Sequence, residues 1–255
     1  MLRTLAFAVS AIALAACSTT PADAPAGAVV ATAAYDMAVN DANRPADDVA
    51  KDAVRKPAET LAFARVMPGQ TVAEVLPGGG YFTRLLSKAV GPTGKVISIV
   101  PASALTFPPQ IDPVRAIASN AAYTNVFVET PEGTLSTSQP VDVYFTAQNY
   151  HDIHGYFGAE AAAAFNRAVF QSLKPGGTYI VIDHSAVAGA GVTGAKTIHR
   201  IEASVVKAEV IAAGFVFDGE LTALANPADP RTGNVFDAAI RGHTDQFALR
   251  FKKPG

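Results

Sequence analysis

Short apolar runs rich in β-branched residues recur along this chain with helical stretches between them, and this alternation constrains the fold most strongly. Five such runs occupy residues 71–76, 95–100, 125–129, 141–147 and 178–185. Strands that are apolar on both faces are typical of a parallel sheet covered by helices on either side. The pattern therefore indicates an α/β protein, and not an all-helical or all-β one.

The stretches between the runs carry apolar residues at helical spacing. They cover residues 45–66, 81–90, 159–173 and 204–214, and more weakly 110–120. Two further apolar runs, 215–224 and 245–253, follow each other with only a loop between them. This arrangement favours an antiparallel strand. We therefore predict a doubly wound, mostly parallel seven-stranded sheet with an antiparallel strand at one end.

The first residues predict export. "MLRTLAFAVSAIALAAC" has a basic residue, an uncharged apolar run and small residues before Cys17, which is the pattern of a secretory signal. "LAAC" resembles the lipobox of bacterial lipoproteins, and that resemblance implies lipidation of Cys17, the only cysteine. The alternative is a plain signal peptide with an incidental cysteine. By the same resemblance, Ser18 favours a lipid anchor in the outer membrane, facing the periplasm.

Three segments follow from this interpretation. Residues 1–17 form a lipoprotein signal peptide, residues 18–42 form a flexible tether of small residues and proline, and residues 43–255 form the folded domain. A formal net charge of −2 and the absence of a basic cluster give no argument for nucleic-acid binding. The membrane, reached through the N-terminal anchor, is the partner that the sequence predicts.

A turn with three consecutive glycines follows the first predicted strand. In "TVAEVLPGGGYFTRLL", Gly78, Gly79 and Gly80 stand between the strand and an amphipathic helix, and Glu74 lies late in the strand. Ligands of open α/β sheets bind at the carboxyl ends of the strands, where a helix N-terminus also offers free N–H groups. The turn is therefore either a ligand cradle or a tight corner, because glycine serves both purposes.

Several blocks resemble class I S-adenosylmethionine-dependent methyltransferases, more narrowly a group of predicted methyltransferases. The blocks are "RKPAETLAFARVMPGQTVAEVLPGGGYFTRLL", "NYHDI", "LKPGGTYIVIDHSA" and "HRIEASVVKAEVIAAGF", which come in the family's order within residues 47–252. The resemblance implies a Rossmann-like methyltransferase fold. It also implies S-adenosylmethionine as cofactor and methyl transfer to a small-molecule or lipid-like acceptor.

The resemblance also assigns cofactor-binding positions. It places the acidic residue of the first strand at Glu74 and the glycines beneath the cofactor's amino-acid part at Gly78–Gly80. Three further positions follow later strands: Glu129 near the adenine, and Gln148 with Asn149 over the methyl-transfer site. Two positions depart from the family pattern, since Leu76 replaces the first glycine and Val100 replaces an acid that holds the ribose hydroxyls.

The motif "NYHDIHGY" supplies the candidate catalytic residues. Tyr150, His151 and Asp152 are expected at the carboxyl end of a central strand, where His151 could take a proton from a nucleophile near neutral pH. A loop histidine bonded to the backbone is the alternative. His151 and His154 would share one helix face, but no third ligand is signalled by spacing, so no metal site is expected.

Other polar residues have weaker assignments. Asp183 and His184 either orient substrate or end a strand in a polar loop, and the second interpretation is favoured. Arg231 and Arg241 lie in a long segment between the last two strands and are possible contacts for an anionic substrate, or members of a solvated loop.

Two other functions stay open. One is a non-catalytic envelope protein that binds a ligand on the same scaffold, because the cofactor is made in the cytoplasm and the ribose acid is missing. The other is a nicotinamide-dependent dehydrogenase, which lacks both a G-x-G-x-x-G turn and an acid at the end of the second strand.

Overall fold

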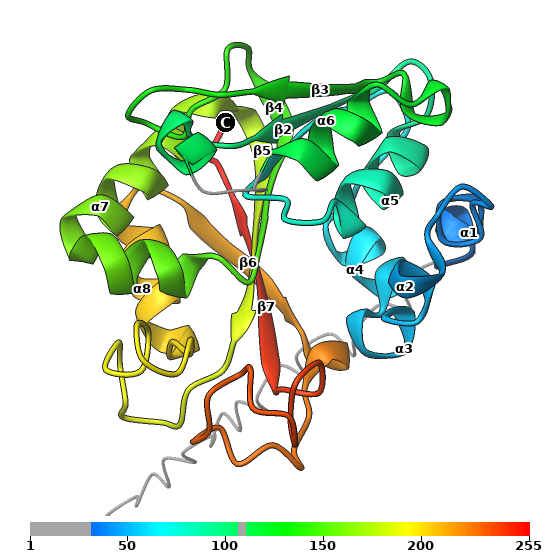
Figure 1. Cartoon of the computed structure of the whole chain (residues 1–255). Coiled ribbons are helices and arrows are strands. Elements are labelled where there is room, and N and C mark those ends of the chain that lie inside the picture. Colours follow the sequence, from blue (N-terminus) through cyan, green and yellow to red (C-terminus); the bar gives the residue numbers. More distant parts are fainter. Residues whose placement is uncertain (1–31, 107–110) are drawn as a thin grey trace, which may run out of the picture.

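A computed structural model describes residues 32–106 and 111–255. One seven-stranded sheet runs through the centre of the molecule, with the strand order β3-β2-β1-β4-β5-β7-β6 (Figure 1). The strands are β1 (Thr71–Val75), β2 (Lys95–Ile99), β3 (Val126–Glu129), β4 (Val141–Ala147), β5 (Leu173–His184), β6 (Val216–Leu221) and β7 (Gln246–Lys252). The predicted α/β fold is confirmed.

The pairing of the strands also agrees with the sequence. The pairs among β1 to β5 are parallel, whereas β7 runs antiparallel to both β5 and β6. β1 pairs with β2 on one side and with β4 on the other, so it lies at the point where the strand order reverses. The carboxyl ends of β1 and β4 are therefore the place where this topology favours a ligand site.

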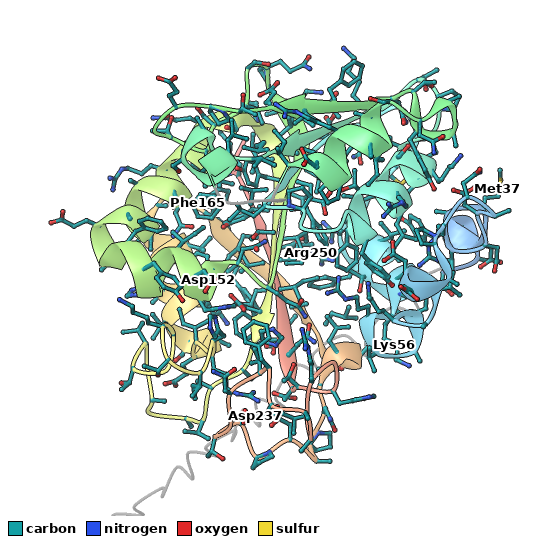
Figure 2. The ribbon with its side chains drawn as sticks, viewed as in Figure 1. Met37, Lys56, Asp152, Phe165, Asp237 and Arg250 are labelled. Carbon is teal, nitrogen blue, oxygen red and sulfur yellow. The ribbon has the colours of Figure 1, made fainter. Side chains whose placement is uncertain are left out.

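Helices cover both faces of the sheet (Figure 1). On one face, α4 (Pro57–Phe63), α5 (Tyr81–Val90) and α6 (Asp112–Ala118) pack on alternate strand residues such as Val72 and Phe145. On the other face, α7 (Tyr150–Ser172) and α8 (Ala203–Ala212) pack on the intervening residues, such as Ala73. Phe165 of α7 points toward the sheet, as Figure 2 shows. The two cores follow from the two-residue repeat of a strand.

The helix after the glycine turn has the predicted bounds. Its apolar residues Phe82, Leu85, Leu86 and Val90 are buried, as their helical spacing predicts. Gly80 caps its start with a left-handed backbone, and Gly91 follows its end.

Two predicted helices differ from the structure. The stretch 45–66 forms three short helices, α2 (Ala46–Val49), α3 (Asp52–Arg55) and α4, because Lys56 adopts a φ of 44° before Pro57 begins α4. The helix expected from residue 159 begins at Tyr150 instead, and a break at Gly158, where φ is 84°, separates its first part from the rest. The "NYHDI" motif is therefore helical.

Part of the predicted tether packs on the domain. Residues 32–35 form the 3₁₀ helix η1 (Thr32–Tyr35), and α1 (Asp36–Val39) follows it. Tyr35 is buried, and its hydroxyl donates to the carbonyl of Val66 at 2.9 Å. A buried aromatic ring removes enough apolar area from water to hold such a segment in place. The expected boundary at residue 43 therefore lies inside packed structure.

The remaining 3₁₀ helices are short connectors: η2 (Ala102–Thr106), η3 (Ala121–Tyr123) and η4 (Thr222–Leu224). Among residues 32–106 and 111–255, no helix has the length and apolar character needed to cross a membrane. The predicted signal peptide, Cys17 and residues 18–31 of the tether lie outside the described residues.

Candidate functional site

A pocket of about 200 Å³ opens at the carboxyl ends of β1 and β4. Its walls come from the end of β1, the glycine turn, the start of α5, helices α2 and α3, and the residues after β4. The lining residues are Asp48, Lys51, Arg55, Glu74, Val75, Leu76, Pro77, Gly78, Gly79, Tyr81, Phe82, Ala147, Gln148 and Asn149. The pocket thus brings together five of the residues that the sequence assigned to cofactor binding, from segments about 70 residues apart.

The glycine turn is partly a cradle and partly a corner. A Cβ atom added at Gly78 or Gly79 would meet nothing within 4 Å, so these two backbones face open space. A Cβ at Gly80 would lie 2.1 Å from Cδ1 of Ile117, so that side chain would have to move, and a φ of 76° also favours glycine at this position. Gly80 does not line the pocket. A ligand could therefore approach the backbone at Gly78 and Gly79 without meeting a side chain.

Glu74 provides a buried carboxyl group at the base of the pocket. It is 3% exposed, and its Oε2 accepts a hydrogen bond from the Thr83 hydroxyl at 2.5 Å. Burial raises the pKa of Glu74 to about 8, although the Thr83 hydrogen bond and the cations Arg55 and Arg84 favour the ionised form. A cationic ligand beside this group would favour ionisation further.

Arg55 is a pocket residue that the sequence analysis did not single out. Its Nη2 donates to Oε1 of Gln148 at 2.9 Å, and its guanidinium lies 4.7 Å from the centre of the Tyr81 ring. Burial lowers the pKa of Arg55, whereas the nearby Asp48 and Glu74 act to raise it. A guanidinium nevertheless remains protonated in proteins. The pocket therefore contains one fixed cation beside one titratable acid.

The backbone around the pocket is unusual at two non-glycine positions. Leu76, which stands where the family pattern has a glycine, adopts a φ of 50°, and Gln148 adopts 62°. Side chains rarely occupy this left-handed region, which costs roughly 1–3 kcal/mol. The Asn149 amide clamps the two strand ends by donating to the carbonyls of Val75 at 3.2 Å and Ala147 at 2.9 Å.

Two positions on the expected adenosine side do not line the pocket. The Glu129 carboxylate accepts hydrogen bonds from the backbone N–H and hydroxyl of Ser138, the former at 3.0 Å. Val100 is 1% exposed, and its N–H donates to the carbonyl of Glu129. In the described structure, Glu129 thus holds a loop and Val100 belongs to the core.

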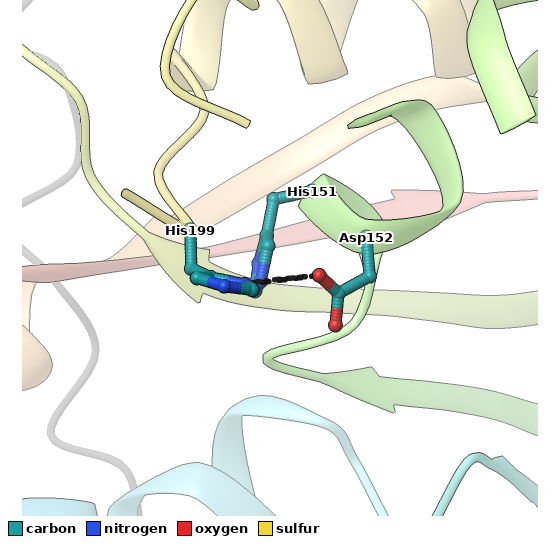
Figure 3. A group of neighbouring side chains, drawn as sticks. All are labelled: His151, Asp152 and His199. Carbon is teal, nitrogen blue, oxygen red and sulfur yellow. Dashed lines mark hydrogen bonds and ion pairs between the residues drawn. The ribbon is translucent and has the colours of Figure 1, made fainter. Parts of the chain in front are cut away.

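The three candidate catalytic residues separate into two environments. Tyr150 is fully buried, donates its hydroxyl to Oε2 of Glu209 at 2.7 Å and accepts from Asn166, so it ties α7 to α8. His151 and Asp152 lie outside the pocket lining and converge with His199 (Figure 3). His199 comes from a loop almost 50 residues later, which no spacing in the "NYHDI" motif could reveal.

Asp183 contacts His151 from the protein interior. Its Oδ1 lies 2.6 Å from Nδ1 of His151, and its Oδ2 accepts the backbone N–H of His151 at 2.8 Å. Burial alone would lower the pKa of His151, but Asp183 and Asp152 outweigh it and raise the pKa to about 10. A protonated His151 cannot act as the general base that the sequence suggested. Asp183 is an internal support for His151, whereas the favoured sequence interpretation was a polar strand end.

The other singled-out residues take part in structural contacts. His154 bonds Glu209 at 3.1 Å through Nε2, and His184 bonds the Thr244 hydroxyl at 2.7 Å. Burial lowers the pKa of His184 to about 4, so this side chain is neutral near pH 7. Arg231 pairs with Asp245 at 3.0 Å and lines a second pocket of about 270 Å³, beside β6 and the start of α8. Arg241 lies over the ring of Phe236 and does not line either pocket.

The fold is similar to those of solved methyltransferases. An S-adenosylmethionine-dependent methyltransferase from Aquifex aeolicus is 18% identical, with a TM-score of 0.58, over 81% of this chain and 94% of that chain. The N-methyltransferase NodS from Bradyrhizobium japonicum is 14% identical, with a TM-score of 0.54, over 82% and 98%. The chain therefore has the class I methyltransferase fold.

The same fold also occurs in proteins with other descriptions. The [4+2]-cyclase SpnF is 15% identical, with a TM-score of 0.58, over 84% of each chain. No protein-family model matches the sequence, and no curated protein matches it. At these identities the comparisons establish the architecture, and the reaction has to be argued from the site.

Proposed function

We propose that this protein binds S-adenosylmethionine at the glycine-turn pocket and transfers its methyl group to a small-molecule or lipid-like acceptor. The observation that carries the proposal is the open backbone of Gly78 and Gly79 above the buried carboxyl group of Glu74. These groups meet at the carboxyl end of β1, at the point where the strand order reverses. The methyltransferase neighbours support this interpretation through the fold.

The pocket fits the amino-acid end of the cofactor. Its volume of about 200 Å³ is smaller than the roughly 300–1,000 Å³ of sites that enclose a whole ligand. Glu74 offers a carboxylate for a cationic group, and Arg55 offers a guanidinium for a carboxylate. The N-terminus of α5 follows the glycine turn, and a helix N-terminus favours an anionic group. The adenosine end would lie beyond this pocket, without a carboxylate at Val100.

The bound cofactor would supply an activated methyl group on a sulfonium. The protein's part is then to position an acceptor at the carboxyl end of β4, near Gln148 and Asn149. Glu74 and Arg55 would hold the charged end in a low-dielectric pocket, where fixed charges act strongly. His151 would not remove the acceptor's proton, because its two carboxylate neighbours hold it protonated.

Calorimetric titration of the full-length protein with S-adenosylmethionine tests this function. Gly78→Arg should abolish binding, because a long side chain would fill the cradle while its Cβ meets no atom of the fold. Gly191→Arg is the matched control: Gly191 has the same φ of 55° and the same open surroundings, but it does not line the pocket. This control should bind like the wild type.

The titration also decides between the enzyme and the non-catalytic scaffold. No heat of binding at millimolar S-adenosylmethionine or its demethylated product would overturn the proposed cofactor, and the scaffold function would replace it. Equal losses in Gly78→Arg and Gly191→Arg would show that backbone strain, and not the cradle, is responsible.

The proposal includes export and lipid anchoring at Cys17, because the apolar run ends in "LAAC". A structure described as a possible exported protein from Bordetella parapertussis is among the neighbours, 15% identical with a TM-score of 0.52 over 79% and 67% of the two chains. The mature protein should partition with membranes, and Cys17→Ala should release it. Intact mass showing an unmodified Met1 in the native host would contradict this part.

A further inference from the structure

Three potential metal ligands converge at the start of α7. His151 Nε2 lies 3.2 Å from His199 Nδ1 and 3.2 Å from Asp152 Oδ1, and the last two atoms are 3.0 Å apart. The atoms thus form an almost equilateral triangle. Figure 3 shows the two imidazole rings close together, with a dashed line from them to the Asp152 carboxylate.

The size of this triangle suits a bound cation. Ligands about 2.0–2.1 Å from Zn²⁺ are about 3.3 Å apart in a tetrahedral site. Around an octahedral ion with similar bond lengths, neighbouring ligands are about 3.0 Å apart. The three observed separations lie between or at these values. The spacing of the three atoms therefore fits one ion bound from one side of the triangle.

Hydrogen bonds can occupy two edges of the triangle at most. Each ring nitrogen carries at most one hydrogen, and a single N–H cannot align with two edges of a triangle. If both nitrogens donate to Asp152, two N–H groups face each other across the His151–His199 edge. If His151 donates to His199, the lone pair of His199 faces the Asp152 carboxylate. A cation could contact all three atoms, because it would displace the protons of the two ring nitrogens and accept a lone pair from each atom.

Asp183 provides the support that a metal-binding histidine commonly has. It is fully buried and holds Nδ1 of His151, which leaves Nε2 directed at the other two atoms. Carboxylate groups that fix a histidine in this way are typical of metal sites. Asp152 and Asp183 together carry two negative charges, which match a divalent ion.

The cluster reaches the protein surface at Asp152. The His151 side chain is 3% exposed, but that of Asp152 is 40% exposed. The exposed rings of Tyr156 and Phe236 stand near His199, with centres 6.5 and 4.9 Å from its ring. Catalytic metal sites commonly have three protein ligands, and water or substrate completes the coordination.

We propose that His151, Asp152 and His199 bind one divalent transition-metal ion such as Zn²⁺, with Asp183 orienting His151. Two imidazoles and one carboxylate favour Zn²⁺, Co²⁺ or Fe²⁺ over Mg²⁺ and Ca²⁺, which prefer oxygen ligands. The sequence showed only His151, His154 and Asp152 in one motif, and the fold replaces His154 with the distant His199. The proposal stands apart from cofactor binding, since the three residues do not line the glycine-turn pocket.

Titration with Zn²⁺ tests the site in full-length protein without a histidine tag, after removal of metal by a chelator. We expect one ion per chain, and a Co²⁺ spectrum typical of nitrogen and oxygen ligands. His199→Gln and Asp152→Asn should each weaken Zn²⁺ binding by about 100-fold or more, and Asp183→Asn by about 10–100-fold. His154→Gln is the control and should keep the wild-type affinity, since His154 lies on the same helix but bonds Glu209.

Thermal unfolding separates loss of the site from loss of the fold. Zn²⁺ should raise the melting temperature of the wild type and of His154→Gln, because a ligand of the folded state stabilises it. It should not raise that of a folded His199→Gln or Asp152→Asn protein. No Zn²⁺ binding by the wild type at micromolar free ion would overturn the proposal. So would binding that His199→Gln and Asp152→Asn leave unchanged.

Discussion

The glycine-turn pocket and the His151–Asp152–His199 cluster both lie at the carboxyl edge of the sheet but are built in different ways. The ligand-facing turn of the pocket consists of residues adjacent in sequence, Glu74 to Gly80, so a local sequence motif predicts it. The cluster needs a helix start at residue 151, a strand end at Asp183 and a loop residue at His199. Local motifs therefore reveal the first kind of site, and only the folded chain reveals the second.

The strongest test of this contrast concerns Arg200, which anchors the loop that carries His199. Arg200 is fully buried, pairs with Asp229 at 2.9 Å and donates to the carbonyl of Ser185 at 3.0 Å. Arg200→Met leaves the buried Asp229 carboxylate without its cation, and only the backbone N–H groups of Arg231 and Asp245 still donate to it. The free energy of unfolding should therefore fall by about 3–5 kcal/mol. Urea denaturation monitored by circular dichroism measures the loss.

Arg65→Met is the matched control for that experiment. Arg65 pairs with Asp218 at 2.9 Å, but its side chain is 54% exposed, so this substitution should cost no more than about 1 kcal/mol. Equal costs for the two substitutions would contradict the role of Arg200 as an internal anchor.

The second prediction concerns Glu74, the titratable acid of the glycine-turn pocket, and the way in which it makes the free energy of unfolding depend on pH. Glu74 has an ordinary pKa of 4.5 when unfolded, and burial raises it to about 8 in the fold. Between these values the folded chain holds a proton that the unfolded chain has lost. This group's contribution to stability is therefore complete below pH 4.5 and falls by up to about 1.4 kcal/mol per pH unit as the pH rises toward 8.

Glu74→Gln removes this dependence, since glutamine stays neutral and can still accept from Thr83. Relative to wild type, the variant should gain stability steadily from pH 5 to pH 8, as measured by urea denaturation at each pH. Glu160→Gln, at an exposed position of α7, should show no such trend. A constant difference between Glu74→Gln and wild type would mean that Glu74 is ionised in the fold.

The smallest expected effect concerns Leu76, whose φ of 50° suits glycine. Leu76→Gly relieves backbone strain but loses the packing of a half-buried side chain, so stability should change by less than about 1 kcal/mol. Binding of S-adenosylmethionine should tighten by a few-fold, because the backbone can come closer to the ligand. Lys56→Gly relieves a similar φ of 44° outside the pocket lining and should leave the affinity unchanged. Weaker binding by Leu76→Gly would show that the leucine contributes to the site.

Much of the fold could be predicted because hydrophobic periodicity reports burial directly. The strand at Val141–Ala147 and the helix at Tyr81–Val90 have the bounds that their patterns indicate. The start of α7 could not be predicted, because "NYHDIHG" contains glycine and polar residues that also suit a loop. Its helical state depends on the Asp183 carboxylate, which accepts the N–H of His151.

The candidate site could also be predicted only in part from the sequence. Glu74, Gly78 and Asn149 line one pocket, because each follows or ends a strand at the same edge of the sheet, whereas Gly80, which was expected with them, does not line it. Arg55 was missed, since no spacing connects α3 with that edge. Glu129 was assigned by resemblance alone, and its carboxylate is occupied by Ser138.

The central claim is that the glycine-turn pocket and the cluster are separate sites with separate ligands. A crossed titration tests it most directly: S-adenosylmethionine and Zn²⁺ are each titrated into full-length Gly78→Arg and His199→Gln proteins. We predict that Gly78→Arg loses S-adenosylmethionine and keeps Zn²⁺, whereas His199→Gln loses Zn²⁺ and keeps S-adenosylmethionine. If either folded variant lost both ligands, or if neither variant lost the ligand assigned to it, the account of two independent sites would be contradicted.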